Sequence, residues 1–584
     1  MKQSNGLLRF QQRQPKQRKN KTARIYCTAD FETTTVEDDC RVWAWGYATL
    51  NEPDYVEEGT DIDSFMARIA QENSNCYFHN LKFDGRFMLD WLLKHGYRHV
   101  VSNKGIYPGT FKTLISDMGM FYSITVRWHN GNNTEFRDSL KKIPNSSVAR
   151  IAKTFNLPMS KGDIDYHAPR AIGHKLTSEE SDYLHRDVSI VAHAMGQIID
   201  SGMTKLTIAS DSMAEYKRLV GGKFFTRMFP VLSEMMDAEI RRAYRGGFTF
   251  ADKRFRGRRV GGGLVLDVNS LYPAMMLNRL LPYGEPEYCE GKVEATDSRP
   301  LVIFSVTFTA RIKPDHIACI QIKGSSIFTA TEYLEKIDEP VTLMVSNIDW
   351  ALYNDHYDIT VLAYGGGWRF HATQGMFDTY IDKWSQVKMA STGGRREIAK
   401  LHLNSLYGKF ASNPNVTSKI PVLKDGVVKL IRGADEKRSP VYTAVGVFIT
   451  SFARDFTIRA AQQSYATFAY ADTDSLHLLT DTVPAAIEQH QTRIGAWKLE
   501  YMFDDAYYIR PKAYLERLAP EHIKTVSNET PNRFVTHIAG LPEKVASTLT
   551  FDDLTPGRIL HGKLTPKAVV GGVVLKDIPF ELKL

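Results

Sequence analysis

The 584-residue chain is too long for a single hydrophobic core, and its length suggests roughly four structural units. Apolar residues make up 43% and charged residues 24%, which is ordinary for a globular protein, and the sequence lacks the run of about eighteen apolar residues that a membrane span needs. The net charge of +8 supports a nucleic-acid partner only weakly, while five cysteines without a CxxC pair argue against a zinc site or disulfide scaffold and for a reducing compartment.

The first 24 residues form a basic segment. Residues 1–24 hold eight Lys or Arg and no acidic residue, and they lack the apolar stretch of a signal peptide. Such a tail either contacts phosphate backbones or acts as a solubilising extension, and the sequence leaves both interpretations open.

Residues 25–205 predict a mixed α/β unit. Segments 24–35 and 40–50 have the pattern of strands. Segments 81–96 and 178–195 have the pattern of helices, the second opened by Ser178 with Glu180 in its first turn.

This unit carries acidic residues at suggestive spacings. Asp30 and Glu32 lie at i and i+2 on the first strand. Tyr183 and Asp187 lie at i and i+4 on one face of a helix. Read singly, each acid is more often a cap, a turn residue or a surface group. Read together, four acids from separate elements predict a site for two metal ions, with Tyr183 orienting a water. These acids are Asp30, Glu32, Asp84 and Asp187.

The chain then changes character. Residues 244–263 are rich in Gly and Arg and indicate a junction, and a strand over 264–268 follows. Asp267 lies near the end of that strand, where a buried carboxylate is costly without a partner. Segments 279–372 and 413–442 are weakly patterned and are interpreted as insertions.

A long helix is predicted over 394–410. Lys400, Asn404 and Tyr407 share one face and provide a cation, an amide and an aromatic ring, which suit a nucleoside triphosphate. The alternative is an ordinary amphipathic helix. The opposite face is apolar and is expected to face the core: Leu403, Leu406 and Phe410.

The stretch FAYADTDSLHLLT, residues 468–480, reads as a buried hairpin with two acids at its turn. Asp472 and Asp474 either share a strand face, about 6.5–7 Å apart, or crowd together across a tight turn. An acidic surface turn is the plain alternative. A third carboxylate from Asp267 would complete an oxygen site suited to Mg²⁺ and to phosphoryl transfer.

Ten motifs follow one another in a characteristic order: DFETTT, YFHNLKFDG, DSLKK, KGDIDYH, YLHRD, YRGGFT, DVNSLYP, KLHLNSLYGKFASNP, YADTDS and KAY. With these motifs the chain resembles the protein-primed family B DNA polymerases of small tailed Bacillus phages, from Ile25 to its C-terminus. The resemblance implies a multidomain fold of α/β and α+β type, with a ribonuclease-H-like 3′–5′ exonuclease domain followed by a right-hand polymerase domain.

The resemblance also implies domain boundaries. The expected parts are a basic extension (1–24), the exonuclease domain (25–207), the first part of the palm (208–278), a first insertion (279–372), the fingers (373–412), a second insertion (413–442), the second part of the palm (443–530) and the thumb (531–584). In this family the two insertions encircle DNA and hold a terminal protein. The alternative is that they are loops of a polymerase with an ordinary primer.

For the exonuclease site, the four acids and Tyr183 match family positions, with Lys161 and Asp163 supporting them. Asp30, Glu32, Asp163 and Asp187 are the expected metal ligands of this site. Positions that hold a frayed primer strand match Thr33, His79, Asn80, Phe83, Ser139 and Leu140.

For the polymerase site, the resemblance implies metal binding by the Asp267 and Asp474 carboxylates, the Val268 carbonyl and the more ambiguous Asp472. The implied nucleotide-binding residues are Tyr272, which would exclude a 2′-hydroxyl, and Lys388, Lys400, Asn404 and Tyr407. The implied DNA contacts are Tyr244 on the template and, on one face of a strand, Lys512 and Tyr514 at the primer terminus.

The resemblance further implies two Mg²⁺ ions per active site, with Mn²⁺ able to substitute. The expected substrates and partners are dNTPs, primer-template DNA, single-stranded DNA in the exonuclease site and a terminal protein, with no membrane. We expect a processive, strand-displacing monomer in the cytoplasm of an infected bacterium.

The sequence departs from the family at the basic tail, around HIAGLPEKV (537–545), and near Trp497, where Glu500 is the available acid. Two competing hypotheses are a 3′–5′ exonuclease whose C-terminal half only binds DNA, and a DNA-binding scaffold without chemistry. The intact acids in both halves of the chain disfavour both.

Overall fold

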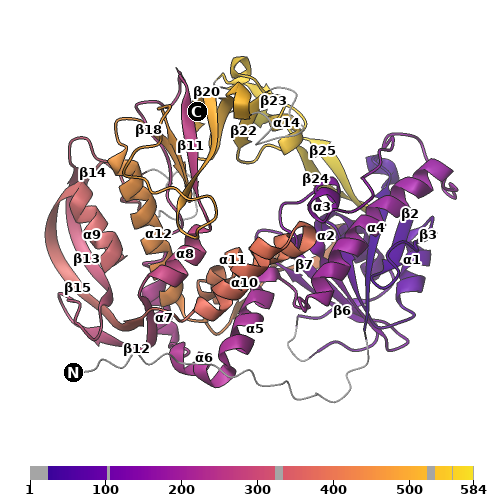
Figure 1. Cartoon of the computed structure of the whole chain (residues 1–584). Helices are drawn as coiled ribbons and strands as arrows, with labels where there is room; N and C mark the ends of the chain where they lie inside the picture. Colours follow the sequence, from indigo (N-terminus) through magenta and orange to yellow (C-terminus); the bar gives the residue numbers. More distant parts are fainter. Residues whose placement is uncertain (1–23, 102–104, 323–332, 523–532, 556, 583–584) are drawn as a thin grey trace.

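The fold is described from a computed structural model (Figure 1), which defines residues 24–101, 105–322, 333–522, 533–555 and 557–582. The basic segment, apart from Arg24, lies outside the described residues. None of the described helices combines the length and the apolarity that crossing a bilayer requires.

The N-terminal unit is built on a mixed sheet of eight described strands in the order β3-β2-β1-β4-β8-β7-β6-β5. Its strands are β1 Ile25–Thr33, β2 Val42–Thr49, β3 Glu57–Gly59, β4 Ser74–Phe78, β5 Arg98–His99, β6 Thr110–Ile115, β7 Phe121–Arg127 and β8 Asn133–Asp138. Its helices are α1 Ile62–Ile69, α2 Leu81–Lys94, α3 Val148–Thr154 and α4 Ser178–Asp200, with 3₁₀ turns η1 Glu37–Asp39 and η2 Ser139–Lys141. The predicted mixed α/β unit is confirmed.

Helix α4 begins where the sequence predicts, although its N-cap is one residue earlier. The Thr177 hydroxyl accepts from the Glu180 N–H, and the Glu180 carboxylate accepts from the Thr177 N–H. This capping box satisfies two backbone donors that the first turn would leave unpaired.

A second sheet forms the centre of the molecule. Within the described residues its order is β22-β21-β20-β11-β19-β18-β9, with β10 paired to β20. Its strands are β9 Thr249–Ala251, β10 Arg259–Val260, β11 Gly263–Val268, β18 Phe468–Asp472, β19 Ser475–Leu478, β20 Trp497–Arg510, β21 Ala513–Leu518 and β22 Phe534–Ile538. The predicted strand around Asp267 and the predicted hairpin at 468–480 therefore lie side by side.

The two weakly patterned segments are regular structures. Residues 279–372 contain the four-stranded sheet β12-β15-β13-β14 and helix α9, and residues 413–442 contain the hairpin β16–β17. The bounds are β12 Leu281–Cys289, β13 Leu301–Ile312, β14 Lys336–Ser346, α9 Asn347–His356, β15 Tyr357–Thr373, β16 Asn415–Lys424 and β17 Val427–Lys437. Their long strands leave many side chains exposed, which weakens the alternation of apolar and polar residues that marks a half-buried strand.

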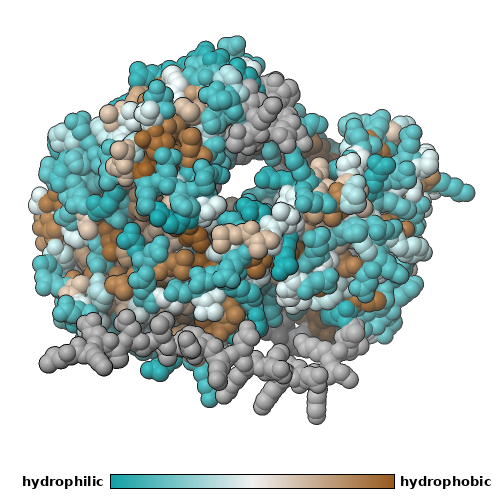
Figure 2. Space-filling model, in the orientation of Figure 1, coloured by the Kyte–Doolittle hydropathy of each residue, from teal (hydrophilic) through white to brown (hydrophobic). Residues whose placement is uncertain are grey.

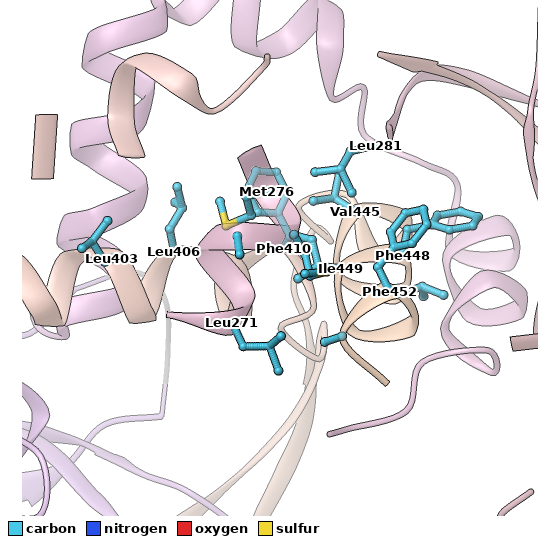
Figure 3. Close-up of a cluster of buried hydrophobic side chains, with 14 of the residues drawn as sticks. Leu271, Met276, Leu281, Leu403, Leu406, Phe410, Val445, Phe448, Ile449 and Phe452 are labelled. Carbon is cyan, nitrogen blue, oxygen red and sulfur yellow. The ribbon is translucent and has the colours of Figure 1, made fainter. Parts of the chain in front are cut away.

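Helices pack beside the central sheet and make the largest described core. They are α5 Ile208–Val220, α6 Gly222–Met228, α7 Glu234–Arg241, α8 Leu271–Asn278, α10 Asp378–Ala390, α11 Gly393–Phe410 and α12 Thr443–Gln463. Figure 3 shows Leu406 and Phe410 of α11 converging with Met276 of α8 and Ile449 of α12. The predicted core face of α11 is confirmed, because Leu403, Leu406 and Phe410 are all buried.

The C-terminal residues reach back to the N-terminal unit. Their elements are η3 Pro520–His522, α14 Glu543–Ala546, η4 Phe551–Asp553, β23 Ile559–Leu560, β24 Leu564–Val569, β25 Gly572–Asp577 and β26 Phe580–Glu581. Val573 and Val574 of β25 belong to the same apolar cluster as Phe87 of α2 and Val428 of β17. Figure 2 shows an opening through the molecule, which lies above the region labelled α11 in Figure 1.

Candidate functional site

Asp472 and Asp474 lie at the turn of the β18–β19 hairpin, where the backbone has an unfavourable conformation. Thr473 between them has a φ of +62°, so the pair crowds across a tight turn and does not share a strand face. The Thr473 N–H donates to the Phe248 carbonyl at 2.6 Å, and its carbonyl accepts from the Thr457 hydroxyl of α12 at 2.9 Å. The turn is therefore fixed from both sides.

Asp474 and Asp267 meet across neighbouring strands. The Val268 N–H donates to the Asp474 carbonyl at 2.8 Å, and Asp267 pairs with Ser475 in the sheet register. Burial, followed by repulsion from Asp474 and Glu500, raises the pKa of Asp267 to about 8. Burial also raises the pKa of Asp474 to about 6, with Asp472 adding to the effect.

A pocket of about 360 Å³ lies between these acids and the helices α8, α10 and α11. It brings together seven predicted residues, Asp267, Asp474, Tyr272, Lys388, Lys400, Asn404 and Tyr407, and the Val268 position. The Tyr272 and Tyr407 rings stack with centroids 4.0 Å apart and form one aromatic floor. Lys388 Nζ lies 3.4 Å from the Ser270 hydroxyl at the start of α8. The pocket therefore combines two acids, two cations and an aromatic surface.

A second pocket of about 420 Å³ lies on the other side of the acids. Its lining includes Asp267, Asp472, Asp474, Glu500 and Tyr514. Glu500, the acid that the sequence offers near Trp497, therefore lies beside the three aspartates. Lys512 Nζ contacts both Asp472 carboxylate oxygens, at 2.9 and 2.8 Å. Asp472 is therefore held by a cation, unlike the Asp267 and Asp474 pair.

The expectation that Lys512 and Tyr514 share a strand face is wrong. Strand β21 begins at Ala513, and Lys512 precedes it in the turn after β20 with a φ of +61°. The turn directs Lys512 to Asp472, whereas Tyr514 lies within the strand.

Tyr244 lies in the junction between α7 and β9, outside both pocket linings. It is nevertheless near the aromatic floor. Burial raises the pKa of Tyr407, and Tyr244 adds to that rise. The junction thus places a third phenol close to the nucleotide-sized pocket.

The four acids of the N-terminal unit converge from three elements. Asp30 and Glu32 lie on β1, Asp84 on α2 and Asp187 on α4. Burial, then repulsion from Asp187, raises the pKa of Asp30 to about 7, and Lys161 opposes that rise. Burial, then repulsion from Asp30, raises the pKa of Glu32 and of Asp84. Such mutual repulsion shows that the acids share one site.

The loop before α4 contributes a cation and a second tyrosine. Lys161 Nζ lies 2.8 Å from an Asp187 carboxylate oxygen. The Tyr183 and Tyr166 hydroxyls are 2.6 Å apart, so Tyr166 is a site neighbour that the sequence analysis missed, although it lies within the quoted KGDIDYH motif. Asp163 is exposed, and its carboxylate accepts from the Ile164 N–H at 3.1 Å. Its role as a metal ligand stays a prediction.

The residues predicted to hold a frayed strand lie beside these acids. His79 accepts or donates at Ser139 Oγ, 2.9 Å away, and contacts the Ser146 carbonyl at 2.8 Å. His79, Asn80 and Leu140 line a pocket of about 1020 Å³ that also includes residues of α11 and β16. Three of the predicted residues lie outside that lining: Ser139, Thr33 at the end of β1, and Phe83, whose ring centroid is 5.7 Å from that of Phe87.

Both acid groups have the character of divalent cation sites. One Asp187 oxygen is buried without a hydrogen-bond partner among the described residues, and the pKa values of Asp30 and Asp267 stay raised although Lys161 and Lys388, respectively, oppose the rise. No set of three or more His, Cys, Asp or Glu side chains in the described part of the chain could hold an ion by itself.

Comparisons with known proteins agree with this geometry. The model of the family described as DNA polymerase type B, organellar and viral, matches residues 66–176 and 169–492. The DNA polymerase of Bacillus phage Nf is 42% identical over 570 residues, which cover 95% of this chain and 99% of that protein.

Two solved structures of the DNA polymerase of Bacillus phage phi29 have the same fold. The complex with primer-template DNA and incoming nucleotide substrates matches with a TM-score of 0.89 and 41% identity, covering 96% of this chain and all of that chain. The complex with single-stranded DNA matches with a TM-score of 0.89 and 40% identity over the same shares.

These matches confirm the predicted multidomain fold class and extend through both halves of the chain, so they do not support a nuclease with a merely DNA-binding C-terminal half. The chain belongs to the type B DNA polymerases of organelles and viruses, and it is a DNA polymerase.

Proposed function

We propose that this polymerase extends a primer over Asp267 and Asp474 and removes 3′-terminal nucleotides at the acids of its N-terminal unit. The proposal of primer extension rests on one observation: Asp267 and Asp474 line both pockets and therefore lie between them. One pocket offers Lys388 and Lys400 to a triphosphate, and the other offers Tyr514 to a primer end. In this arrangement the primer 3′-hydroxyl loses its proton and attacks the α-phosphate of a dNTP in line, the bond between the α- and β-phosphates breaks, and pyrophosphate leaves.

DNA polymerases of this family use divalent metal cofactors, and we propose Mg²⁺, two per active site, with Mn²⁺ as a substitute. When bound, such ions lower the pKa of the attacking hydroxyl and stabilise charge on the phosphate oxygens. Asp267, Asp474 and the Val268 carbonyl would hold them in the polymerase site. Asp472 is already ion-paired with Lys512, so its part would be smaller.

The proposed 3′–5′ exonuclease rests on the second acid group. Asp30, Glu32 and Asp187 would hold metal there, and Asp84 would complete the group of acids. Lys161 lies 2.8 Å from the Asp187 carboxylate, and Tyr183 on α4 would orient the attacking water. The adjoining pocket with His79, Asn80 and Leu140 has a volume of about 1020 Å³ and would receive the single strand. The phi29 enzyme with 40% identity was solved in complex with single-stranded DNA.

We further propose protein priming, processive synthesis and strand displacement by a monomer. The sheet within 279–372 and the hairpin within 413–442 would bind the terminal protein and DNA. The opening in Figure 2 offers a passage bordered by several parts of the chain. The Bacillus phage relatives indicate a phage replication enzyme that works in the infected host cell.

The test uses a 5′-labelled primer on a longer template with Mg²⁺, with and without dNTPs. We expect extension with dNTPs and shortening without them. Asp474→Ala should abolish extension and leave degradation, whereas Asp30→Ala with Asp84→Ala should do the reverse, because the two sites hold separate metals. Loss of degradation in a folded Asp474→Ala protein would contradict the model with two sites.

A further inference from the structure

Glu516 is a fully buried carboxylate beneath the polymerase site that the proposed chemistry does not use. It lies on β21, and its side chain is 0% exposed. The Tyr508 hydroxyl donates to Oε1 at 2.7 Å and the Tyr501 hydroxyl donates to Oε2 at 2.8 Å. His477 Nδ1 lies 2.6 Å from Oε1. A buried carboxylate needs such partners, and here three side chains converge on one acid.

The Tyr501 and Tyr508 hydroxyls stay protonated and donate hydrogen bonds to Glu516. Burial, followed by the charge of Glu516, raises the pKa of Tyr501 and of Tyr508 well above the ordinary value. Both therefore keep their protons and direct them at the carboxylate. Since the three partners come from strands β19 and β20, the acid on β21 ties its own strand to both of them.

The partners of Glu516 reach the pocket beside the catalytic acids. His477 and Tyr501 line the 420 Å³ pocket together with Tyr514. The Tyr514 ring lies 5.1 Å from the His477 ring at an interplanar angle of 75°, and 6.2 Å from the Tyr508 ring. Glu516 thus holds two of the rings that set the position of Tyr514.

The same network reaches Lys512 through Tyr470. The Tyr470 ring stacks on Tyr508 with centroids 5.5 Å apart, and its hydroxyl accepts from the Lys512 N–H at 2.9 Å. Lys512 then contacts Asp472 with its ammonium group. Because Lys512 has a positive φ, this backbone hydrogen bond helps to hold an otherwise unfavourable conformation.

We propose that Glu516 is a positioning residue for the primer terminus, which acts through His477 and Tyr508 on Tyr514 and through Tyr470 on Lys512. This inference rests on the proposed primer contacts of Tyr514 and Lys512. The dNTP pocket on the other side of the acids has none of these residues in its lining, so Glu516 affects the primer and not the nucleotide.

The test is Glu516→Gln in the full chain, because glutamine keeps the shape but cannot accept from all three partners. We expect extension at limiting primer-template to fall roughly tenfold, which corresponds to about 1.4 kcal/mol. A larger share of primers should be degraded than extended. The KM for dNTP should be unchanged. Tyr508→Phe, which removes one donor without changing the pocket lining, should shift the same balance by a smaller factor.

The matched control is Asp237→Asn, another buried carboxylate, which is 2% exposed and holds Arg241 at 3.0 Å. It should lower stability and leave the balance of extension and degradation unchanged. Equal loss of both activities in Glu516→Gln and Asp237→Asn, in proportion to the unfolded fraction, would overturn the proposal. If Glu516→Gln does not fold, an unchanged balance in Tyr508→Phe overturns it instead.

Tyr514→Ala separates this proposal from the one on which it rests. Weakened primer use in Tyr514→Ala with normal use in folded Glu516→Gln would refute the role of Glu516 alone. Normal primer use in Tyr514→Ala would refute the primer contact itself.

Discussion

At the scale of single residues, the pKa values of Asp267 and Asp474 indicate that a bound cation would stabilise their charged forms. The pKa of Asp267 is raised to about 8 and that of Asp474 to about 6, above the ordinary value of 3.8. Between 3.8 and these values the folded protein binds more protons than the unfolded chain. In the absence of metal, the contribution of this pair to the free energy of unfolding therefore falls as pH rises through that window.

Metal removal should consequently matter more at high pH. We expect Mg²⁺, relative to EDTA, to raise the Tm more at pH 8 than at pH 6, because at pH 6 protons already neutralise part of the pair. Thermal unfolding at both pH values measures this difference. Asp267→Asn with Asp474→Asn should reduce the Mg²⁺ effect at pH 8, leaving only the part due to the second acid group. An equal Mg²⁺ effect at both pH values would contradict the expectation.

A second prediction at the residue scale concerns Tyr272. Its ring stacks on Tyr407 with centroids 4.0 Å apart, and it lines the same pocket as Lys388 and Lys400. Tyr272→Val should admit ribonucleotides by removing bulk beneath the sugar, with an expected loss of discrimination of at least tenfold. Competition between a dNTP and the matching rNTP in primer extension measures this. Unchanged discrimination would exclude that role, and Tyr407→Phe serves as the control that keeps the ring.

At the scale of elements, helix α11 has two faces with different expected roles: one packs in the core and the other lines the proposed nucleotide pocket. Its apolar face packs on α8 and α12, and its polar face lines the 360 Å³ pocket that we propose for the nucleotide. The helical period alone assigns these faces, because residues three and four apart lie on the same side of a helix.

The two faces should respond differently to mutation. Leu406 is 0% exposed, so Leu406→Ala should cost about 2–5 kcal/mol of unfolding free energy through lost contacts and a cavity. Lys400 is exposed, so Lys400→Ala should leave stability nearly unchanged and raise the KM for dNTP. Urea unfolding and steady-state extension measure the two effects. A stability loss in Lys400→Ala as large as that in Leu406→Ala would contradict this division.

At the scale of the whole molecule, the C-terminal hairpin β24–β25 closes the chain on itself. Lys567 Nζ lies 2.6 Å from a Glu37 carboxylate oxygen of the N-terminal unit, and Lys576 contacts the same acid. Apolar residues of β25 share a cluster with α2. This closure borders the opening seen in Figure 2, and it depends partly on exposed ion pairs, which salt screens.

Weakening the closure should shorten synthesis. Lys567→Glu with Lys576→Glu should reduce the product length per binding event several-fold while leaving single-nucleotide addition unchanged. Extension with an excess of trap DNA measures this length. Adding Glu37→Lys should restore part of it by reversing the pair. Unaltered product length at low and high salt would show that the ion pairs do not contribute to processivity.

Short-range patterns made much of this molecule predictable. The strands at Asp30 and Asp267, the helix faces of α4 and α11 and the acidic turn at 472–474 follow from spacing within a few residues. The sheet within 279–372 was not predicted, because its longest strand, β15, is largely exposed and lacks the alternation of a half-buried strand.

The sequence by itself determined which side chains share a helix face or a strand, because those relations depend on a fixed local period. Only the tertiary structure decided which distant residues meet. Lys512 pairs with Asp472 from 40 residues away, and Lys567 reaches Glu37 across 530 residues. Glu516 shows the same limit, because nothing in KAYLERL distinguishes an exposed glutamate from one buried under two tyrosines and a histidine. The physical reason is that burial and charge pairing are set by packing between strands, and packing has no signature within one segment.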